Sequence, residues 1–307
     1  MNLLITGLNG FVGGNLVAKF KDHHTIYGLD IVAPQKEGVY KTFDWNELDR
    51  IPAVEVIIHL AGLAHDVNNT KLEKDYYHVN TELTKTIFNF FLTSSAQTFI
   101  YFSTVKAVCD FSDIPLVETV IAEPSTIYGK SKRKAEEYIL NNLPYDGRLV
   151  YILRPCMIHG PQPKGNLVSL YNYFRRGFPY PLANFSNNRS YLSINNLIFI
   201  LERILVSKME SGIYHVSDDE PLSTNEIIEM IGEVINKKPL MINLPKWMIK
   251  TMGHLGTVFH LPVNDGAVKK LTSNYLVSNC KLKKALNIEL PMSAKEGMLL
   301  TLKNLAK

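Results

Sequence analysis

Short apolar runs alternate with longer segments of helical pattern over the first half of the chain. The apolar runs predict strands at 2–6, 25–31, 54–62, 98–104 and 149–155. The intervening segments predict helices from the glycine-rich turn at 7–10 to about Lys21, at 73–94 and at 125–142. Strands that are apolar throughout and separated by helices are typical of a parallel sheet covered on both faces. The pattern therefore predicts an α/β fold with a doubly wound parallel sheet of the Rossmann type.

The pattern changes after Pro155. Pro and Gly become frequent over 155–181, and the helical segments that follow are short, at 195–207, 224–236 and 295–306. We expect a second, smaller substrate-binding lobe whose chain interleaves with the first. The predicted division assigns 1–163 and a return segment at about 189–216 to the nucleotide-binding lobe, and 164–188 and 217–307 to the smaller lobe.

Composition excludes several classes of protein. The chain has 307 residues, of which 46% are hydrophobic and 20% charged, as in a folded globular protein. Lys and Arg number 33 against 29 Asp and Glu, a balance too even for the basic stripe of a nucleic-acid-binding protein. Cys109, Cys156 and Cys280 are too widely spaced for a disulfide framework or a metal site, so we expect a reducing, cytoplasmic location and no metal.

Two segments raise the question of a membrane. The first 18 residues carry no charge, but the first cation, Lys19, lies on the wrong side for a signal peptide, and the segment is too rich in Gly and Asn to span a bilayer. A buried strand and an anion-binding turn explain it better, so we expect no stable membrane insertion. The apolar and basic segment 246–261 suits either peripheral contact with a membrane, where it would favour a lipid-linked sugar, or a helix and loop packed within the smaller lobe.

A glycine-rich turn joins the first predicted strand to the first helix. Residues 6–13 read TGLNGFVG, in which the glycines allow a tight turn and let a pyrophosphate approach the helix N-terminus. Asp30 ends the second strand, where a carboxylate binds the adenosine ribose hydroxyls and repels a 2′-phosphate. The carboxylate of Asp30 therefore favours NAD over NADP. Asp44 either contacts the adenine or is an ordinary loop residue.

Tyr128 and Lys132 stand four residues apart in a predicted helix that we expect Ser125 to cap, so both project from one face. A free phenol has a pKa of about 10, and a neighbouring ammonium is expected to lower it by stabilising the phenolate. The pair therefore predicts a proton donor and acceptor beside a carbinol. Ser103 and Thr104 end a predicted strand, where α/β enzymes place ligands, and a hydroxyl there can relay the substrate proton.

Taken together, these motifs resemble the extended short-chain dehydrogenases/reductases, in the nucleotide-sugar epimerase/dehydratase group. The matching segments follow the family order over nearly the whole chain: TGLNGFVG (6–13), Asp30, HLAG (59–62), VN (79–80), FSTVK (102–106), YGKSK (128–132), LRPCMIHGP (153–161), GNL (165–167) and NRSYLSINNL (188–197). The resemblance implies NAD as the cofactor and a nucleotide sugar, of the UDP-linked class, as the substrate. It also implies a homodimer through the helices at 73–94 and 125–142.

The resemblance also implies a role for each matching residue. Tyr128 would be the catalytic acid and base, Lys132 would hold the nicotinamide ribose, and Thr104 would be the catalytic hydroxyl with Ser103 beside it. The implied cofactor-binding residues are Gly7, Asn9, Gly10, Phe11, Val12, Gly13, Asp30, Asp44, Leu60, Ala61, Gly62, Asn80, Lys132 and Pro155. Asn166 and Arg189 match positions that contact the diphosphate of the sugar nucleotide.

Departures from the family pattern narrow the activity. Cys109-Asp110 replaces a frequent Tyr-Gly, and the region 271–290 lacks the Arg of standard UDP-galactose epimerases. The sequence is more similar to bacterial surface-polysaccharide members that act on N-acetylated or deoxygenated UDP-sugars. We expect a C4 epimerase that works through a 4-keto sugar, with an NAD(P)H-dependent 4-keto reductase as the alternative.

Two other activities fit the residues less well. A 4,6-dehydratase is disfavoured because Val105-Lys106 stand where Asp-Glu is usual. A catalytically silent NAD-binding sensor or scaffold would not need Tyr128, Lys132 and Thr104, all of which are present.

Overall fold

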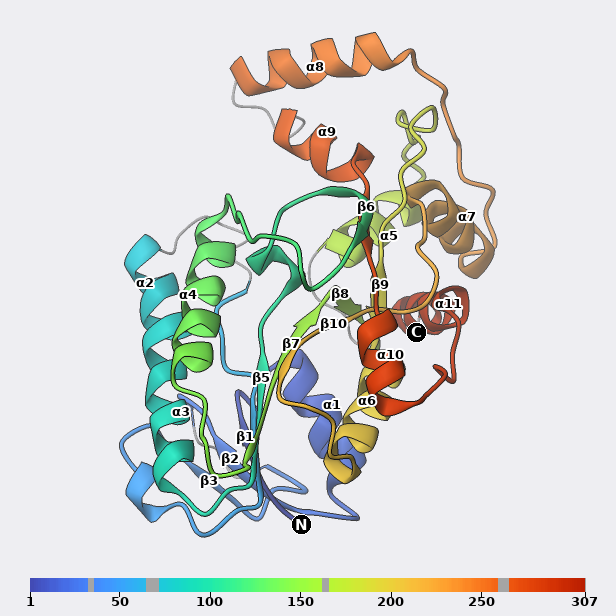
Figure 1. Cartoon of the computed structure of the whole chain (residues 1–307). Helices are drawn as coiled ribbons and strands as arrows, with labels where there is room; N and C mark the ends of the chain where they lie inside the picture. The colour runs from blue at the N-terminus through green and yellow to red at the C-terminus, as the bar shows by residue number, and fades with distance from the viewer. Residues whose placement is uncertain (33–35, 65–71, 162–165, 259–264, 307) are drawn as a thin grey trace.

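The computed structural model describes residues 1–32, 36–64, 72–161, 166–258 and 265–306. Its centre is a seven-stranded sheet in the order β10-β7-β5-β4-β1-β2-β3 (Figure 1), in which every neighbouring pair is parallel. The strands are β1 (Asn2–Thr6), β2 (Thr25–Leu29), β3 (Lys41–Phe43), β4 (Val56–His59), β5 (Thr98–Phe102), β7 (Leu149–Pro155) and β10 (Gly212–Val216). The predicted doubly wound α/β fold is confirmed.

Helices cover both faces of this sheet. On one face lie α1 (Phe11–Phe20) and α6 (Ile194–Val206), and on the other α3 (Leu83–Thr93) and α4 (Ile127–Asn141) (Figure 1). Successive side chains of β1 enter different cores, with Leu3 and Ile5 packed on the α1–α6 side and Leu4 on the α3–α4 side. A strand buried on both faces has no room for charge, which explains the uncharged start of the chain.

A π-helical turn interrupts the helical segment predicted at 73–94. The segment begins with α2 (Glu73–Tyr77), continues through the π-helical turn His78–Glu82 and ends with α3. The chain remains helical throughout. Short 3₁₀ turns occur at Leu48–Arg50 and Val105–Ala107. π-helical turns occur frequently at functional sites, and this one carries Asn80.

The chain beyond β7 forms most of a second layer and returns once to the main sheet as β10. Its helices are α5 (Asn166–Arg175), α7 (Thr224–Val234), α8 (Lys246–Val258), α9 (Asp265–Thr272), α10 (Cys280–Leu286) and α11 (Ala294–Ala306). Two small parallel sheets accompany them, β6 (Ser112–Leu116) with β11 (Tyr275–Val277) and β8 (Met157–His159) with β9 (Tyr191–Ser193). A separate apolar core, which includes Ile228 and Met298, holds α5, α7 and α11 together.

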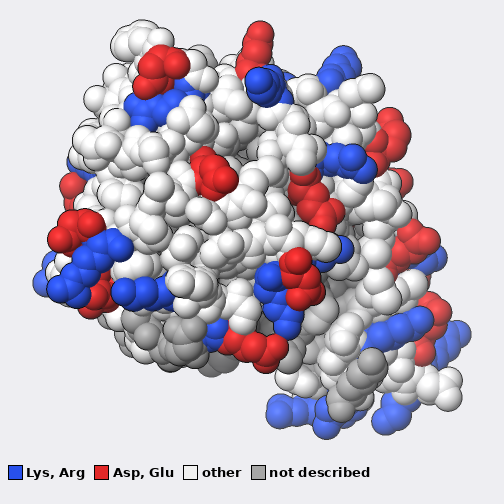
Figure 2. Space-filling model, turned by 90° about the horizontal axis from the view of Figure 1, so that it is seen from below, with Lys and Arg blue, Asp and Glu red and all other residues white. Residues whose placement is uncertain are grey.

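The carboxyl ends of the main-sheet strands and the N-terminus of the chain lie at opposite ends of the molecule. In Figure 1 the strands of the main sheet run upward, so their carboxyl ends meet below α8 and α9, and the N-terminus lies at the opposite end. Figure 2 views the molecule from below, where acidic and basic side chains are interspersed. The strand order reverses at β1, which lies between β2 and β4, and α/β proteins bind ligands at the carboxyl edge beside such a point.

Candidate active site

The glycine-rich turn fits the backbone of the neighbouring loop closely. Gly7 has φ +69°, and a Cβ on it would lie 2.8 Å from the backbone nitrogen of Ala61. A Cβ on Gly13 would lie 2.6 Å from the Gly7 carbonyl oxygen. The N-cap of α1 is Gly10, which makes no side-chain cap hydrogen bond, so first-turn N–H groups can bind an anion. Phe11 and Val12 begin this helix. The geometry fits a pyrophosphate.

Asp30 lies directly after β2 and faces this turn. Its carboxylate accepts hydrogen bonds from the backbone N–H groups of Asn9 (3.0 Å) and Ile31 (2.8 Å) and stays partly exposed. The Asn9 side chain donates to the carbonyl of Val32 at 3.1 Å. These contacts hold a carboxylate at the edge of the turn, where the predicted ribose contact requires it.

Asp44 and Lys36 add to the surroundings of the turn. The Asp44 carboxylate accepts from the backbone N–H of Asn46 at 2.6 Å and so closes a local turn, and its contact with adenine stays a prediction. Lys36, which the motifs did not indicate, donates to the Leu8 carbonyl at 2.9 Å. It places a cation against the glycine-rich turn, and only the folded chain brings the two together.

Asn80 ties the loop after β4 to helix α4. Its side-chain oxygen accepts from the Leu63 N–H at 2.7 Å, and its amide nitrogen donates to the Leu63 carbonyl (3.1 Å) and to the Ser131 hydroxyl (3.0 Å). Asn80 is fully buried. A Cβ on Gly62 would lie 3.0 Å from Nζ of Lys132, so this loop and the lysine are in contact.

His59, the last residue of β4, helps to hold the loop that follows this strand, a role that the sequence did not reveal. Its ring nitrogens contact the hydroxyls of Thr6 (2.6 Å) and Thr84 (2.9 Å). Burial lowers the pKa of His59 well below its ordinary value, so the ring is neutral. Thr6 also accepts from the N–H of Ala61 at 3.0 Å, and Leu60 donates to the Thr6 carbonyl at 3.3 Å.

Helix α4 is capped differently from our expectation. Thr126 is the N-cap, and its hydroxyl accepts from the Gly129 N–H at 3.2 Å. The predicted cap, Ser125, instead donates its hydroxyl to the carboxylate of Asp110. Both residue types cap helices well, and Asp110 also accepts from the Thr126 hydroxyl at 3.5 Å. Tyr128 still falls in the first turn of α4.

Tyr128 lies beside Thr104, whose hydroxyl acts to lower the pKa of the phenol. Burial raises the pKa of Tyr128 to about 12. Lys132 donates to the Phe102 carbonyl at 2.8 Å, and burial lowers its pKa to about 7. We expected Lys132 to lower the pKa of Tyr128. Here burial disfavours both charged forms and Nζ is bound to the strand end, so burial sets the pKa of the phenol, and the effect of Lys132 on it stays a prediction.

Ser103 and Thr104 face different surroundings. The Ser103 hydroxyl donates to Glu136 at 2.5 Å, and Glu136 also accepts two hydrogen bonds from Arg154, at 2.8 and 2.6 Å. Glu136 and Arg154 are essentially inaccessible to solvent. The negative charge of Glu136 raises the pKa of Lys132, against the larger effect of burial. The structure therefore brings Thr104, and not Ser103, to the phenol of Tyr128.

The second layer contributes Arg189. Its backbone pairs with Leu222 and Tyr275, and its guanidinium lies 6.0 Å from the centre of the Tyr275 ring. Its positive charge opposes the rise in pKa that burial causes in Tyr191. Pro155 is buried at the end of β7, and Asn166 begins α5 with its side chain outside the described part of the structure.

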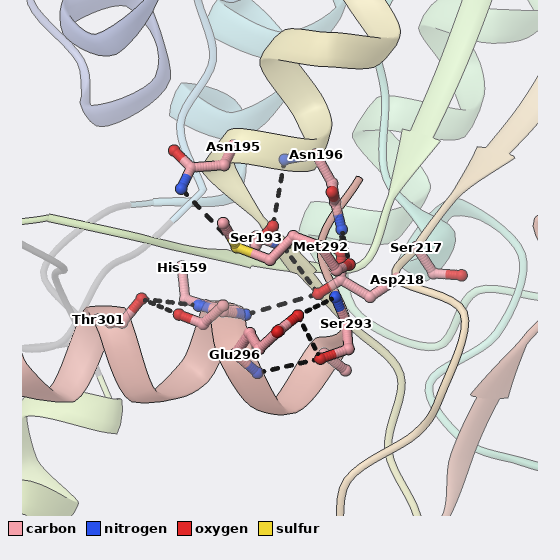
Figure 3. A network of polar contacts seen from close by, with 12 residues as sticks. His159, Ser193, Asn195, Asn196, Ser217, Asp218, Met292, Ser293, Glu296 and Thr301 are labelled. Carbon is pink, nitrogen blue, oxygen red and sulfur yellow. Dashed lines mark hydrogen bonds and ion pairs between the residues drawn. The ribbon is translucent and has the colours of Figure 1, made fainter. Parts of the chain in front are cut away.

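A polar network joins the second layer to the Rossmann part (Figure 3). The buried carboxylate of Asp218 accepts from the Ser193 N–H at 3.0 Å and from the Asn196 amide at 2.7 Å. His159 contacts the Thr301 hydroxyl at 2.9 Å. A cavity of about 200 Å³ lies beside this network, with His159, Ser193 and Thr301 among its lining residues. His159, Ser193 and Asn196 lie in segments that matched the family pattern, but the sequence did not predict the network, which fixes α11 against α6.

The described residues also bear on metal binding and on crossing a membrane. Among them, no group of three or more His, Cys, Asp or Glu residues is placed to hold a metal ion. Likewise, none of the helices in the described ranges combines the length and apolar character that crossing a bilayer requires.

The fold is that of a Rossmann-type α/β protein, and its glycine-rich turn is shaped for a dinucleotide. The chain belongs to the NAD dependent epimerase/dehydratase family, whose sequence profile matches residues 3–216. It is 28% identical to a UDP-glucose 4-epimerase of Vibrio cholerae, over 96% of this chain and 93% of that protein. It is 26% identical to the N-acetyl-alpha-D-glucosaminyl-diphospho-ditrans,octacis-undecaprenol 4-epimerase of Escherichia coli O157:H7, over 92% and 85%.

A solved structure has the same fold. The Bordetella bronchiseptica enzyme WbmG, crystallised in complex with NAD, superposes with a TM-score of 0.78 at 17% identity, over 99% of this chain and 93% of that one. The cofactor of the family is NAD, and the glycine-rich turn with Asp30 beside it fits that cofactor.

Proposed function

We propose that this protein is an NAD-dependent epimerase that inverts C4 of a UDP-linked hexose or N-acetylhexosamine through a transient 4-keto sugar. One observation carries the proposal. The Tyr128 phenol lies beside Thr104, just beyond the carboxyl end of β5, and Lys132 from the next turn of the same helix contacts the loop at Gly62. A proton-transferring phenol thus lies next to the predicted nucleotide turn.

The residues divide the work as follows. Tyr128 accepts the proton of the C4 hydroxyl and returns it, while Thr104 orients the phenol and shares the substrate hydroxyl. NAD, when bound, supplies the acceptor and donor for the C4 hydride. Lys132 holds the ribose next to it, and Asn80 fixes the loop that carries Gly62. Arg189 binds the diphosphate as a bidentate cation.

The raised pKa of Tyr128 constrains this scheme. With a pKa of about 12, the phenol is neutral at physiological pH and starts as a hydrogen-bond donor. Its deprotonation requires positive charge near the hydroxyl. We infer that Lys132 leaves the Phe102 carbonyl, or shares its protons, when the ribose binds. Lys132 has a pKa of about 7, so it can carry or release a proton there.

The relatives suggest the substrate class but leave the carrier open. One relative carries the name of a UDP-glucose epimerase, the other that of an epimerase of a polyprenyl-diphosphate-linked N-acetylglucosamine. Both names share C4 inversion of a sugar attached through a diphosphate, which is the part we carry over to this chain. We further propose a role in surface-polysaccharide synthesis and a homodimer through α3 and α4.

The same residues also suit an NAD(P)H-dependent 4-keto reductase, because the half-reaction that reduces a 4-keto sugar is common to both enzymes. An epimerase regenerates its NAD in each catalytic cycle, whereas a reductase consumes one reduced cofactor for each sugar it reduces. The purified protein is incubated with UDP-glucose, or with UDP-N-acetylglucosamine, without added cofactor and followed by NMR. We expect inversion at C4. Failure to interconvert any UDP-hexose, together with NADH consumption on a UDP-4-keto sugar, would exclude the epimerase.

A further inference from the structure

Helix α8 has one packed side and one exposed side. Ile249, Gly253 and Gly256 are buried. A Cβ on Gly253 would lie 3.0 Å from Asp265 and 3.2 Å from Val268 of α9, so the glycine permits close packing of the two helices. At 100° per residue these three positions share one side of α8. The helix is therefore held by one stripe, and most of its other described positions are exposed, while Met248 is half-buried.

Large apolar side chains are exposed outside that stripe. Trp247 is 68% exposed, Met252 48% and Leu255 49%. At 100° per residue, Trp247 and Leu255 lie on the side opposite the packed stripe, and Met252 lies between that side and Gly256. We call these three side chains, together with the flanking Lys246 and Lys250, the α8 face. A Trp exposed to this extent on a helix that also exposes Met and Leu is unusual for a surface in contact with water alone.

The charges next to these apolar side chains on α8 are positive. Lys246 and Lys250 are exposed on α8, which contains no Asp or Glu, and the Lys246 ammonium lies 5.6 Å from the centre of the Phe185 ring. On α9, Lys269 is exposed as well, whereas the Asp265 carboxylate, 52% exposed, accepts from the Thr257 hydroxyl at 3.0 Å and lies 3.5 Å from a ring nitrogen of His254. An apolar arc containing Trp, flanked by Lys, is typical of helices that lie in the plane of a membrane surface. The positive charge favours anionic lipid.

The position of the helix supports the same interpretation. In Figure 1, α8 projects from the body of the molecule, at the end toward which the strands of the main sheet run. Tyr128 and the glycine-rich turn lie at that carboxyl edge. A bilayer in contact with α8 would therefore be on the same side of the molecule as the active site. A helix of 13 residues is also too short to span a bilayer and suits interfacial contact.

We propose that the α8 face docks on the anionic surface of a lipid bilayer. Trp247, Met252 and Leu255 enter the headgroup region, while Lys246 and Lys250 contact lipid phosphates. A second copy of the chain fits the face less well, because two such faces in contact would bring the lysines of both copies together. The proposal does not depend on the reaction that the protein catalyses.

Vesicle binding tests the proposal directly. The full-length protein is sedimented with vesicles of phosphatidylcholine containing phosphatidylglycerol, and with vesicles of phosphatidylcholine alone. We expect partition onto the anionic vesicles to be at least about tenfold stronger, and to weaken as salt is raised. The double variants Trp247→Ser/Leu255→Ser and Lys246→Glu/Lys250→Glu should each lower it about tenfold or more. Equal binding of these variants, or no binding to either vesicle, would overturn the proposal.

The chain offers a matched control and an internal probe. Tyr145 is fully exposed just before β7, at the opposite end of the strands, so Tyr145→Ser removes a large exposed side chain away from the face and should leave vesicle binding unchanged. The chain has 2 Trp, so Trp45→Phe leaves Trp247 as the only one. Its emission should then shift to shorter wavelength on anionic vesicles. An unshifted emission would place Trp247 outside the contact and contradict the proposal.

Two further measurements separate the alternatives. Circular dichroism and thermal unfolding show whether the variants of the α8 face are folded. We expect the charge-reversal variant to disturb folding less, because it leaves the apolar side chains in place. If light scattering shows that Trp247→Ser/Leu255→Ser dissociates an oligomer while vesicle binding is unchanged, the face joins copies of the chain and the proposal is wrong. A protein that binds vesicles but epimerises no sugar leaves this proposal standing and removes the proposed function.

Discussion

Arg154 and Glu136 form an ion pair in the core directly behind Lys132, and its removal is our most quantitative prediction. Two hydrogen bonds of 2.8 and 2.6 Å join the two side chains, with 1% of Arg154 and none of Glu136 exposed to solvent. Arg154→Met keeps an unbranched apolar chain in place of the aliphatic part of Arg154 but removes the guanidinium and its charge. The carboxylate of Glu136 is then left in the core with the hydroxyl of Ser103 and a longer contact of 3.3 Å to the half-buried Arg133.

The expected cost follows from that environment. Breaking a buried ion pair on one side costs about 3–5 kcal/mol, because an uncompensated charge remains in the core. Ser103 and Arg133 compensate part of the charge, so we expect the lower part of this range, about 3 kcal/mol. Single domains are stable by about 5–15 kcal/mol, and the loss is therefore a large part of the total. Adding Glu136→Gln removes the stranded charge and should recover at least about 1 kcal/mol.

Urea unfolding followed by circular dichroism measures these differences. The matched control is Arg50→Met, since Arg50 pairs with Glu47 at 2.8 Å on the surface, where its side chain is 66% exposed. An exposed pair contributes about 0.2–1 kcal/mol, so the control should unfold close to the wild type. If Arg154→Met costs no more than Arg50→Met, or if the double variant is less stable than the single one, the buried charge does not govern the stability of this region.

Three other predictions concern the catalytic residues. Tyr128→Phe should lower turnover by about 10²–10⁴-fold while bound NAD, measured after acid release, is unchanged; near-normal turnover would refute the role of the phenol. Thr104→Val should lower kcat more than Ser103→Ala does. Ser103→Ala should instead lower the free energy of unfolding by about 1.5–3 kcal/mol, because the Ser103 hydroxyl bonds to a buried carboxylate. The reverse ranking of kcat would contradict the assignment of Thr104 as the catalytic hydroxyl. Burial lowers the pKa of Lys132 to about 7, so above that pH the unfolded chain binds a proton that the cofactor-free folded chain does not. The stability of the wild type relative to Lys132→Met should therefore rise from pH 7 to 9, by at most about 1.4 kcal/mol per unit, and a difference independent of pH would contradict the burial of the lysine.

Most of the parallel sheet could be predicted because its strands are buried on both faces and bounded by turns. The strand predicted at 149–155 matches β7. Others end earlier, as β4 does at His59, since the residues beyond leave the sheet for the loops that form the site. The short edge strand β3 was missed, because three residues of mixed polarity give no periodic signal.

The features that could not be predicted depend on contacts between distant parts of the chain. Nothing near Ser125 in the sequence shows that Asp110 occupies its hydroxyl, so the cap was assigned one residue too early. The partnership of Ser103 with Glu136 is equally non-local. The pKa of Tyr128 depends on burial, which four-residue spacing in a helix does not determine.

A substrate labelled with deuterium at C4 tests the proposed reaction most directly. We predict that the C4-inverted sugar retains the deuterium on C4 when the purified protein acts without added cofactor, because the hydride that leaves one face returns to the other. NMR measures both the inversion and the position of the label in one sample. An inverted product carrying solvent hydrogen at C4, or no inverted product from any UDP-hexose, would contradict the proposed function.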